Sequence, residues 1–86
     1  MEAKKAVAIA KSWVADQFAG EGVQDIGLEE VRFSSGVWQI TIGFSRRWER
    51  AASNLLADLR QQRTYKVITI SDKTEEVIAM RNREAA

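Results

Sequence analysis

The chain has neither cysteine nor histidine among its 86 residues. Without histidine it lacks the usual general base at neutral pH, and without cysteine it lacks a thiol nucleophile. A Ser-His-Asp triad is excluded, as is a zinc site built from the usual histidine and cysteine ligands. No disulfide can form, so apolar packing has to hold the fold together. These absences predict a protein that is not an enzyme and that has no metal site and no cofactor.

Long apolar runs and an excess of one charge are also missing. The run from Ala6 to Ala10 is the longest and is far below the roughly 18 residues of a membrane span. Lys11 and Asp16 interrupt the segment after it, which is unlike a signal peptide. We therefore expect a cytoplasmic protein with no membrane partner, unless a leader has been removed. Thirteen basic residues nearly balance twelve acidic ones, which argues against a dedicated nucleic-acid binder.

Two pairs of adjacent carboxylates, Glu29–Glu30 and Glu75–Glu76, remain as candidates for acid–base chemistry. Neighbouring side chains on a strand point to opposite faces of the sheet, so neither pair converges on one substrate. The turn at residues 72–75 lacks the repeated acidic spacing and the glycine of a calcium loop. We interpret all these carboxylates as solvated surface charges.

Apolar residues at helical spacing predict an N-terminal helix over residues 2–19, within a first segment of residues 1–20. Gly20 is placed to take the left-handed conformation after the last turn, and residues 23–27 are expected to form a linker. The apolar stripe of this helix consists of Ala6, Val7, Ile9, Ala10, Trp13, Val14 and Phe18.

Strict alternation over residues 37–45 predicts a half-buried strand. A preceding strand over residues 28–34 is separated from it by Ser35 and Gly36, which suit a tight turn, so residues 28–45 form a first hairpin. A second hairpin is expected over residues 65–81. Its strands are residues 65–71, which are rich in β-branched side chains, and residues 75–80, joined by a turn at 72–74. Residues 81–86 are expected to fray.

The stretch between the hairpins, residues 46–63, is rich in arginine and has no glycine or proline. Trp48 and four aliphatic residues recur there at helical spacing, which predicts a helix over residues 47–60, with Ser45 placed to cap it. The alternative is a long loop, which loop-length statistics disfavour. The aliphatic members of the stripe are Ala52, Leu55, Leu56 and Leu59.

Together these elements predict an α+β fold, with the first helix packed on one face of a four-stranded antiparallel meander. Alternation assigns side chains to the two faces of the sheet. Trp38, Ile40, Ile42, Phe44, Ile68 and Ile70 are expected to face the helix, and Gln39, Thr41, Tyr65, Val67 and Thr69 the opposite side. The second set mixes polar and apolar side chains, so we expect that face to be partly covered.

The second hairpin resembles that of PepSY-like and cystatin-like small bacterial domains. In those domains an aromatic strand is followed by an acidic turn and then by Gly-Glu-Val and an apolar residue. Here Tyr65 opens the strand, Asp72 lies in the turn, and Glu76, Val77 and Ile78 follow. Residues 37–42 resemble the central strand of these domains, whereas Glu75 stands where they usually have glycine. The resemblance implies an inhibitory, regulatory or protein-binding role and transfers no functional residue.

The arginine-rich segment is the candidate contact site. Its arginines are opposed only by Glu49 and Asp58, and guanidinium groups bind carboxylate or phosphate with two parallel hydrogen bonds. The alternative is the solvated face of an amphipathic helix, as most charged runs are. The predicted partner-binding residues are Arg46, Arg47, Trp48, Arg50, Arg60 and Arg63, with Tyr65 and Val67 on the outer sheet face.

Three functions are compatible with this pattern. The leading hypothesis is a non-catalytic protein-binding module of inhibitor, immunity or regulatory type, which uses its sheet face, its strand edges and the arginines, or which self-associates. The alternative is a nucleic-acid-binding protein that uses residues 46–63. A small-ligand carrier would need a pocket beside Trp13 and Trp38, for which a chain of this length leaves little room.

Overall fold

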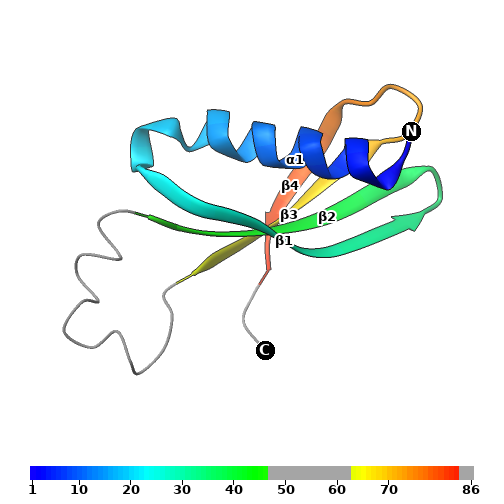
Figure 1. Cartoon of the computed structure of the whole chain (residues 1–86). Helices are drawn as coiled ribbons and strands as arrows, with labels where there is room; N and C mark the ends of the chain where they lie inside the picture. Colours follow the sequence, from blue (N-terminus) through cyan, green and yellow to red (C-terminus); the bar gives the residue numbers. More distant parts are fainter. Residues whose placement is uncertain (47–62, 84–86) are drawn as a thin grey trace.

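One helix packs across a four-stranded antiparallel sheet in the computed structural model, which describes residues 1–46 and 63–83 (Figure 1). The helix α1 spans Ala3–Gln17, and a single 3₁₀ turn, η1, follows at Ala19–Glu21. The strands β1 (Val23–Ser34), β2 (Val37–Arg46), β3 (Thr64–Ser71) and β4 (Val77–Asn82) lie side by side in chain order. The predicted α+β fold is confirmed. The helix predicted over residues 47–60 lies outside the described residues.

The contact face of α1 is built from small side chains. Ala6, Ala10 and Val14 are fully buried and lie at helical spacing, so the helix backbone comes close to the sheet. The helix ends at Gln17, with Phe18 as its C-cap, and it is Gly22, with φ of 64°, that takes the left-handed conformation. The prediction for Gly20 is therefore wrong, because the 3₁₀ turn moves the reversal two residues further along.

The first hairpin is longer than predicted. Ser35 and Gly36 both have positive φ (52° and 77°), as the two-residue turns that match the twist of a hairpin require. Beyond the predicted strand, Val23 pairs with Arg46 and Gln24 with Ser45, so residues 23–27 belong to β1 and not to a linker. Register shifts interrupt the alternation of β1, and this irregularity hides the strand from sequence reasoning.

The core lies between α1 and the middle strands. Ile40, Ile42 and Phe44 of β2 and Ile68 and Ile70 of β3 are fully buried against the helix, as predicted. Trp38 and Trp13 are only half-buried and pack at the margin of this cluster. Burial of large aliphatic and aromatic side chains is the main stabilising contribution in a domain without disulfides.

The loop of the second hairpin is two residues longer than predicted. Glu75 has φ of 61°, and its backbone N–H donates to the carbonyl of Ser71 over 2.8 Å, which extends the turn. As a result β4 begins at Val77 rather than Glu75 and continues through Arg81 and Asn82, which pair with Val67 and Lys66. The expectation that the chain frays from Arg81 is wrong for the described residues.

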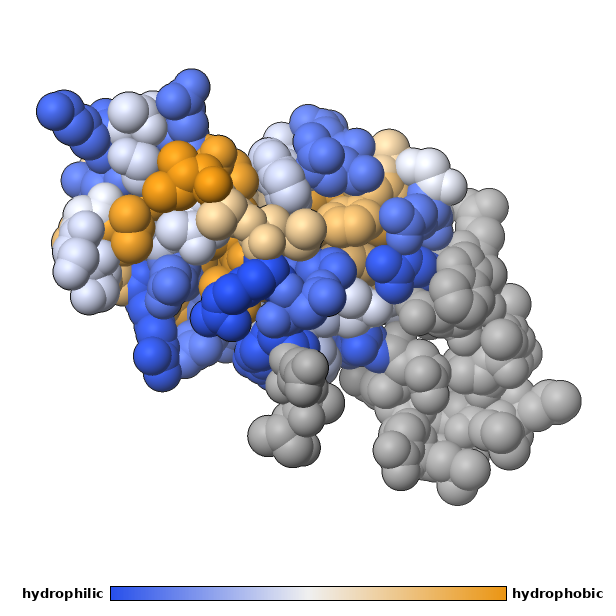
Figure 2. All heavy atoms as spheres, turned by 180° about the vertical axis from the view of Figure 1, so that it is seen from behind, coloured by the Kyte–Doolittle hydropathy of each residue, from blue (hydrophilic) through white to orange (hydrophobic). Residues whose placement is uncertain are grey.

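No helix among residues 1–46 and 63–83 is long and apolar enough to cross a bilayer. The outermost strand β4 carries two large hydrophobic side chains that are exposed, Ile78 and Met80. Seen from behind, the molecule shows a band of hydrophobic surface with strongly hydrophilic side chains below it (Figure 2).

A basic open face of the sheet

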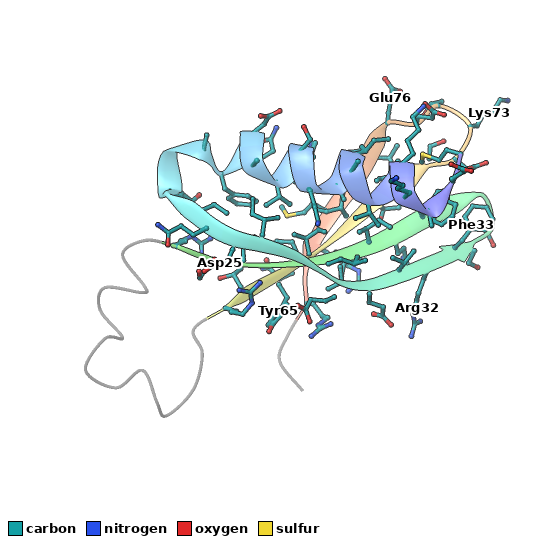
Figure 3. The ribbon with its side chains drawn as sticks, in the orientation of Figure 1. Asp25, Arg32, Phe33, Tyr65, Lys73 and Glu76 are labelled. Atoms are coloured by element: carbon teal, nitrogen blue, oxygen red, sulfur yellow. The ribbon has the colours of Figure 1, made fainter. Side chains whose placement is uncertain are left out.

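The face of the sheet that points away from α1 is the candidate functional site, and we call it the open face. No described helix lies on it, and Arg32 and Tyr65 project from it on the side opposite the helix (Figure 3). Strand pairing aligns its residues across the sheet: Glu30 beside Thr41, Thr41 beside Val67, and Val67 beside Arg81. The open face comprises Glu30, Arg32, Gln39, Thr41, Gly43, Arg63, Tyr65, Val67, Thr69, Arg81 and Arg83.

Tyr65 is held at one end of the open face by its neighbours. It pairs with Gly43, where a Cβ would come within 2.8 Å of the tyrosine ring, so the absence of a side chain at Gly43 makes room for the ring. The Arg83 guanidinium lies 4.6 Å from the ring centroid, within the range of a cation–π contact. The ring of Tyr65 is therefore already packed between strand backbone and a cation.

Arg63 directly precedes β3, near this tyrosine, and connects the start of β3 to the start of β1. One of its terminal nitrogens donates to the backbone carbonyl of Asp25 over 2.9 Å. The same nitrogen would be 3.2 Å from a Cβ on Gly43 and 3.9 Å from one on Gly27. The paired glycines thus leave a shallow path for the arginine across two strands.

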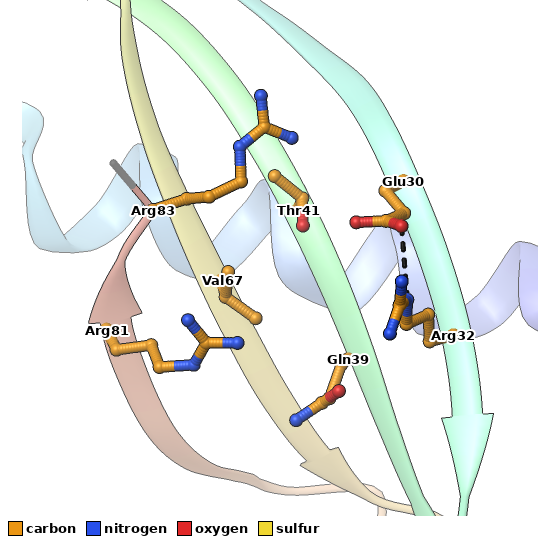
Figure 4. Close-up of a pocket in the computed structure, with 7 residues that line it drawn as sticks. All are labelled: Glu30, Arg32, Gln39, Thr41, Val67, Arg81 and Arg83. Carbon is orange, nitrogen blue, oxygen red and sulfur yellow. Dashed lines mark hydrogen bonds and ion pairs between the residues drawn. The ribbon is translucent and has the colours of Figure 1, made fainter. Parts of the chain in front are cut away.

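A hollow of about 190 Å³ occupies the centre of the open face (Figure 4). Thr41 and Val67 are each only 3% exposed and lie among its lining residues, although they are on the face that α1 does not cover. Arg81 and Arg83 come from the β4 side and Glu30 and Arg32 from β1, with Gln39 at one end. The hollow is therefore polar and basic, with a small buried floor.

The charges around this hollow are unequal. Arg32 donates from Nε to a carboxylate oxygen of Glu30 over 3.1 Å, and both side chains are well exposed. Among the described residues, Arg81 has no ion pair, and the Arg83 guanidinium has neither a hydrogen bond nor an ion pair but lies over the Tyr65 ring. Two guanidinium groups are therefore available here to an anionic ligand.

Arg46, predicted to act together with Arg63, lies on the opposite face of the sheet. Its Nε is 2.5 Å from a carboxylate oxygen of Glu21, and a terminal nitrogen donates to the hydroxyl of Thr64 over 2.9 Å. Its guanidinium also lies 5.3 Å from the Phe44 ring centroid. With a side chain only 15% exposed, Arg46 lies over the end of the core and not on the open face.

The structure brings together Arg63, Tyr65 and Val67 from the predicted set on one face. Arg47, Trp48, Arg50 and Arg60 lie outside the described residues. Sequence reasoning missed Arg32, Arg81 and Arg83. Arg32 had a usable signal, since it alternates with Val31 and Phe33, two apolar residues on the other face of the strand. The i, i+2 spacing of Arg81 and Arg83 would have placed both on one face, had the last strand not been ended at Met80.

Among the residues that the structure describes, the carboxyl group with a shifted pKa is Asp72, which lies away from the open face in the loop after β3. The N-terminal ammonium group of Met1 donates to Asp72 over 2.8 Å, and the indole N–H of Trp38 donates to the same oxygen over 2.9 Å. These hydrogen bonds, the ammonium first, hold the pKa of Asp72 below its ordinary value. No described cluster of acidic residues could hold a metal ion.

A second, open hollow runs beside Trp13, between α1 and the start of β4 at Glu76 and Val77. Trp38 is not part of it. Its ring instead packs on Phe33, with the ring centroids 4.7 Å apart, and its indole binds Asp72. Within residues 1–46 and 63–83 the two tryptophans are therefore engaged at different places, which does not favour a small-ligand carrier.

Comparison with protein-family models, with curated proteins and with solved structures gave no match for this chain. The function is therefore inferred from the residues and their geometry.

Proposed function

We propose that this protein is a non-catalytic protein-binding module whose open face contacts an acidic surface of its partner. The observation that carries the proposal is the pair Arg81 and Arg83, which extend over the buried Thr41 and Val67 without a carboxylate partner among the described residues. Arginine forks are enriched at protein interfaces because they bind carboxylates in a fixed geometry and shed water readily.

The construction of the sheet supports a contact surface more than a reaction centre. Histidine and cysteine are absent from the sequence, and the carboxylate nearest the hollow, Glu30, is already paired with Arg32. Rigid strands hold the arginines in fixed register across the sheet. A surface of this kind offers defined positions for a partner's side chains and no nucleophile or general base.

The resemblance to PepSY-like and cystatin-like domains is consistent with an inhibitory, immunity or regulatory role. Glu75 occupies the position where those domains usually have glycine, and its φ of 61° is a conformation that glycine adopts without strain. The shape of the second hairpin is thus compatible with the resemblance even where the residue differs.

A nucleic-acid-binding function is the second candidate, because Arg32, Arg63, Arg81 and Arg83 all lie on one face beside Tyr65. Two features weigh against it. The ring of Tyr65 already packs on Gly43 and Arg83, whereas a stacking platform needs a free aromatic face. The net charge of the chain is only +1, which gives weak long-range attraction to a polyanion.

Affinity capture with two forms of the full chain tests the proposed function. The wild type and an Arg32→Glu, Arg81→Glu, Arg83→Glu variant are immobilised, and proteins retained from a native extract are identified by mass spectrometry. We expect at least one protein that the wild type retains and the variant loses. Light scattering on both forms detects self-association through the same face. Capture of the same proteins by both forms, with the wild type monomeric, would refute the proposal.

A further inference from the structure

From the hollow on the open face we infer a specific chemistry: Arg81 and Arg83 together grip one side-chain carboxylate of an acidic protein segment. This inference rests on the proposed function and narrows it to an aspartate or glutamate anchor. The hollow is about 190 Å³ and is bordered by both guanidinium groups, with Gln39 and Thr41 as additional polar groups (Figure 4). A carboxylate is small enough for this space and accepts two parallel hydrogen bonds from one guanidinium.

The register of the sheet sets the positions of the two arginines. Arg81 is the direct cross-strand neighbour of Val67, and the backbone N–H of Arg83 donates to the carbonyl of Tyr65 over 3.1 Å. Both arginines are therefore anchored along β3, two positions apart on one face, and their side chains extend from the β4 side over the hollow, towards Thr41 and Val67 (Figure 4). The bonded backbone reduces the ordering cost when a ligand binds.

The surroundings favour a single carboxylate over an extended polyanion. The bond of Arg32 to Glu30 already neutralises one cation of the face. Among the described residues this leaves Arg81 and Arg83 at the hollow, which is enough positive charge for one carboxylate but little for a run of phosphates. The floor formed by Thr41 and Val67 is almost fully buried, so a ligand group that enters the hollow is partly removed from water. Partial desolvation strengthens a charge-assisted hydrogen bond.

The test is a titration of the isotopically labelled full chain, followed by nuclear magnetic resonance. The probes are a capped tetraglutamate peptide, its tetraglutamine counterpart, inorganic phosphate and a single-stranded oligonucleotide. We expect the tetraglutamate peptide to shift the arginine Nε–H signals, the Gln39 side-chain amide and the Thr41 backbone amide in a saturable manner. The tetraglutamine peptide should leave them unmoved.

Matched charge variants locate the binding site. Arg81→Gln with Arg83→Gln should weaken the tetraglutamate affinity at least tenfold. Lys4→Gln with Lys11→Gln removes the same charge from exposed positions on α1 and should change it less than twofold. If the arginine double variant fails to fold, Arg81→Lys with Arg83→Lys keeps the charge but loses the fork, and it should weaken binding about threefold or more.

Three results would overturn the inference. The first is that both pairs of charge substitutions weaken tetraglutamate binding equally, and the second is that the peptide shifts only signals on other surfaces. The third is that phosphate or the oligonucleotide binds more tightly than tetraglutamate, the oligonucleotide with a steep salt dependence. If tetraglutamate does not bind at the hollow but partner capture still requires the open-face arginines, only the inference fails. If partner capture does not require these arginines, the proposed function fails as well.

Discussion

The two faces of the same sheet differ in almost every physical property. On the side of α1, alternate residues of β2 and β3 are isoleucine and phenylalanine with no exposed surface. On the open face, the intervening positions of the same strands are glutamine, threonine, glycine, tyrosine and valine, and arginines reach over them from β1 and β4. Because strand alternation assigns each residue to one face, stability and recognition can be placed on separate sets of side chains.

The difference also shows how a chain with almost balanced charge can carry a basic surface. The acidic residues Asp72, Glu75 and Glu21 form ion pairs with Met1, Lys5 and Arg46, all away from the open face. The guanidinium groups of Arg81 and Arg83, which have no carboxylate partner in the part of the chain that the structure describes, remain on the open face. Net charge alone therefore underestimates the local field that a partner meets.

The largest effect on stability is expected from a substitution on the covered face. Phe44→Ala removes a fully buried ring that packs 5.4 Å from Phe18, and it should lower the free energy of unfolding by about 3–5 kcal/mol. Urea titration followed by circular dichroism measures the loss. The control is Ile78→Ala on β4, where the side chain is 57% exposed and the change should be within about 0.5 kcal/mol. Similar losses in the two variants would contradict the placement of the core.

A smaller effect is expected where the open face is tightly packed. A Cβ on Gly43 would lie 2.8 Å from Tyr65, so Gly43→Ala should displace the ring and cost about 1–3 kcal/mol. The clash should largely disappear when Tyr65 is also replaced by alanine. A double-mutant cycle from urea denaturation measures this coupling, and strictly additive effects would show that the ring does not rest on Gly43.

The loop that joins β3 to β4 gives a test that is independent of both faces. Glu75 has a left-handed backbone, which strains any residue with a Cβ. Glu75→Gly and Glu75→Ala both remove the exposed ion pair with Lys5, so the difference between them isolates the backbone term. The glycine variant should be more stable than the alanine variant by about 1 kcal/mol, measured by thermal or urea unfolding. A more stable alanine variant would rule out the left-handed conformation.

The smallest effect concerns pH. The Met1 ammonium and the Trp38 indole lower the pKa of Asp72 in the folded protein. A carboxylate with a lowered pKa stabilises the fold above its unfolded-state pKa of about 4, and this contribution is lost as the pH falls through the lower folded value. Asp72→Asn should therefore lower the unfolding free energy at pH 6 and converge with the wild type near pH 2. An unchanged difference between the two pH values would refute this assignment.

The sequence predicts the covered face and the part of the open face that β2 and β3 contribute, but it misses the arginines of β1 and β4, for physical reasons. Ile40, Ile42 and Phe44 alternate without interruption, and the apolar stripe of α1 keeps helical spacing, so the burial of both can be predicted from the sequence alone. The ends of β1 and β4 cannot be predicted in this way. A register shift at Gln24–Gly27 and the left-handed Glu75 displace the alternation, and these features depend on pairing with neighbouring strands.

Some residues of the candidate site could not be predicted for the same reason. Clustering along the chain indicates residues 46–63, yet Arg46 and Arg63 lie on opposite faces of the sheet. Arg46 alternates in phase with the inward-facing Phe44, whereas Arg63 alternates in phase with Tyr65 on the open face. Arg32, Arg81 and Arg83 are distant in sequence and meet only through the meander, in which β4 follows β3 and β1 borders β2. A surface assembled across strands requires the register before it can be recognised.

The most direct test of this division between the two faces measures binding and stability together in a variant with Arg32, Arg81 and Arg83 all replaced by glutamine. We predict that proteins captured by the wild type are lost, while the unfolding free energy changes by less than about 1 kcal/mol, since these side chains lie outside the core. Retention of the same proteins by a folded variant would contradict the assignment of recognition to the open face.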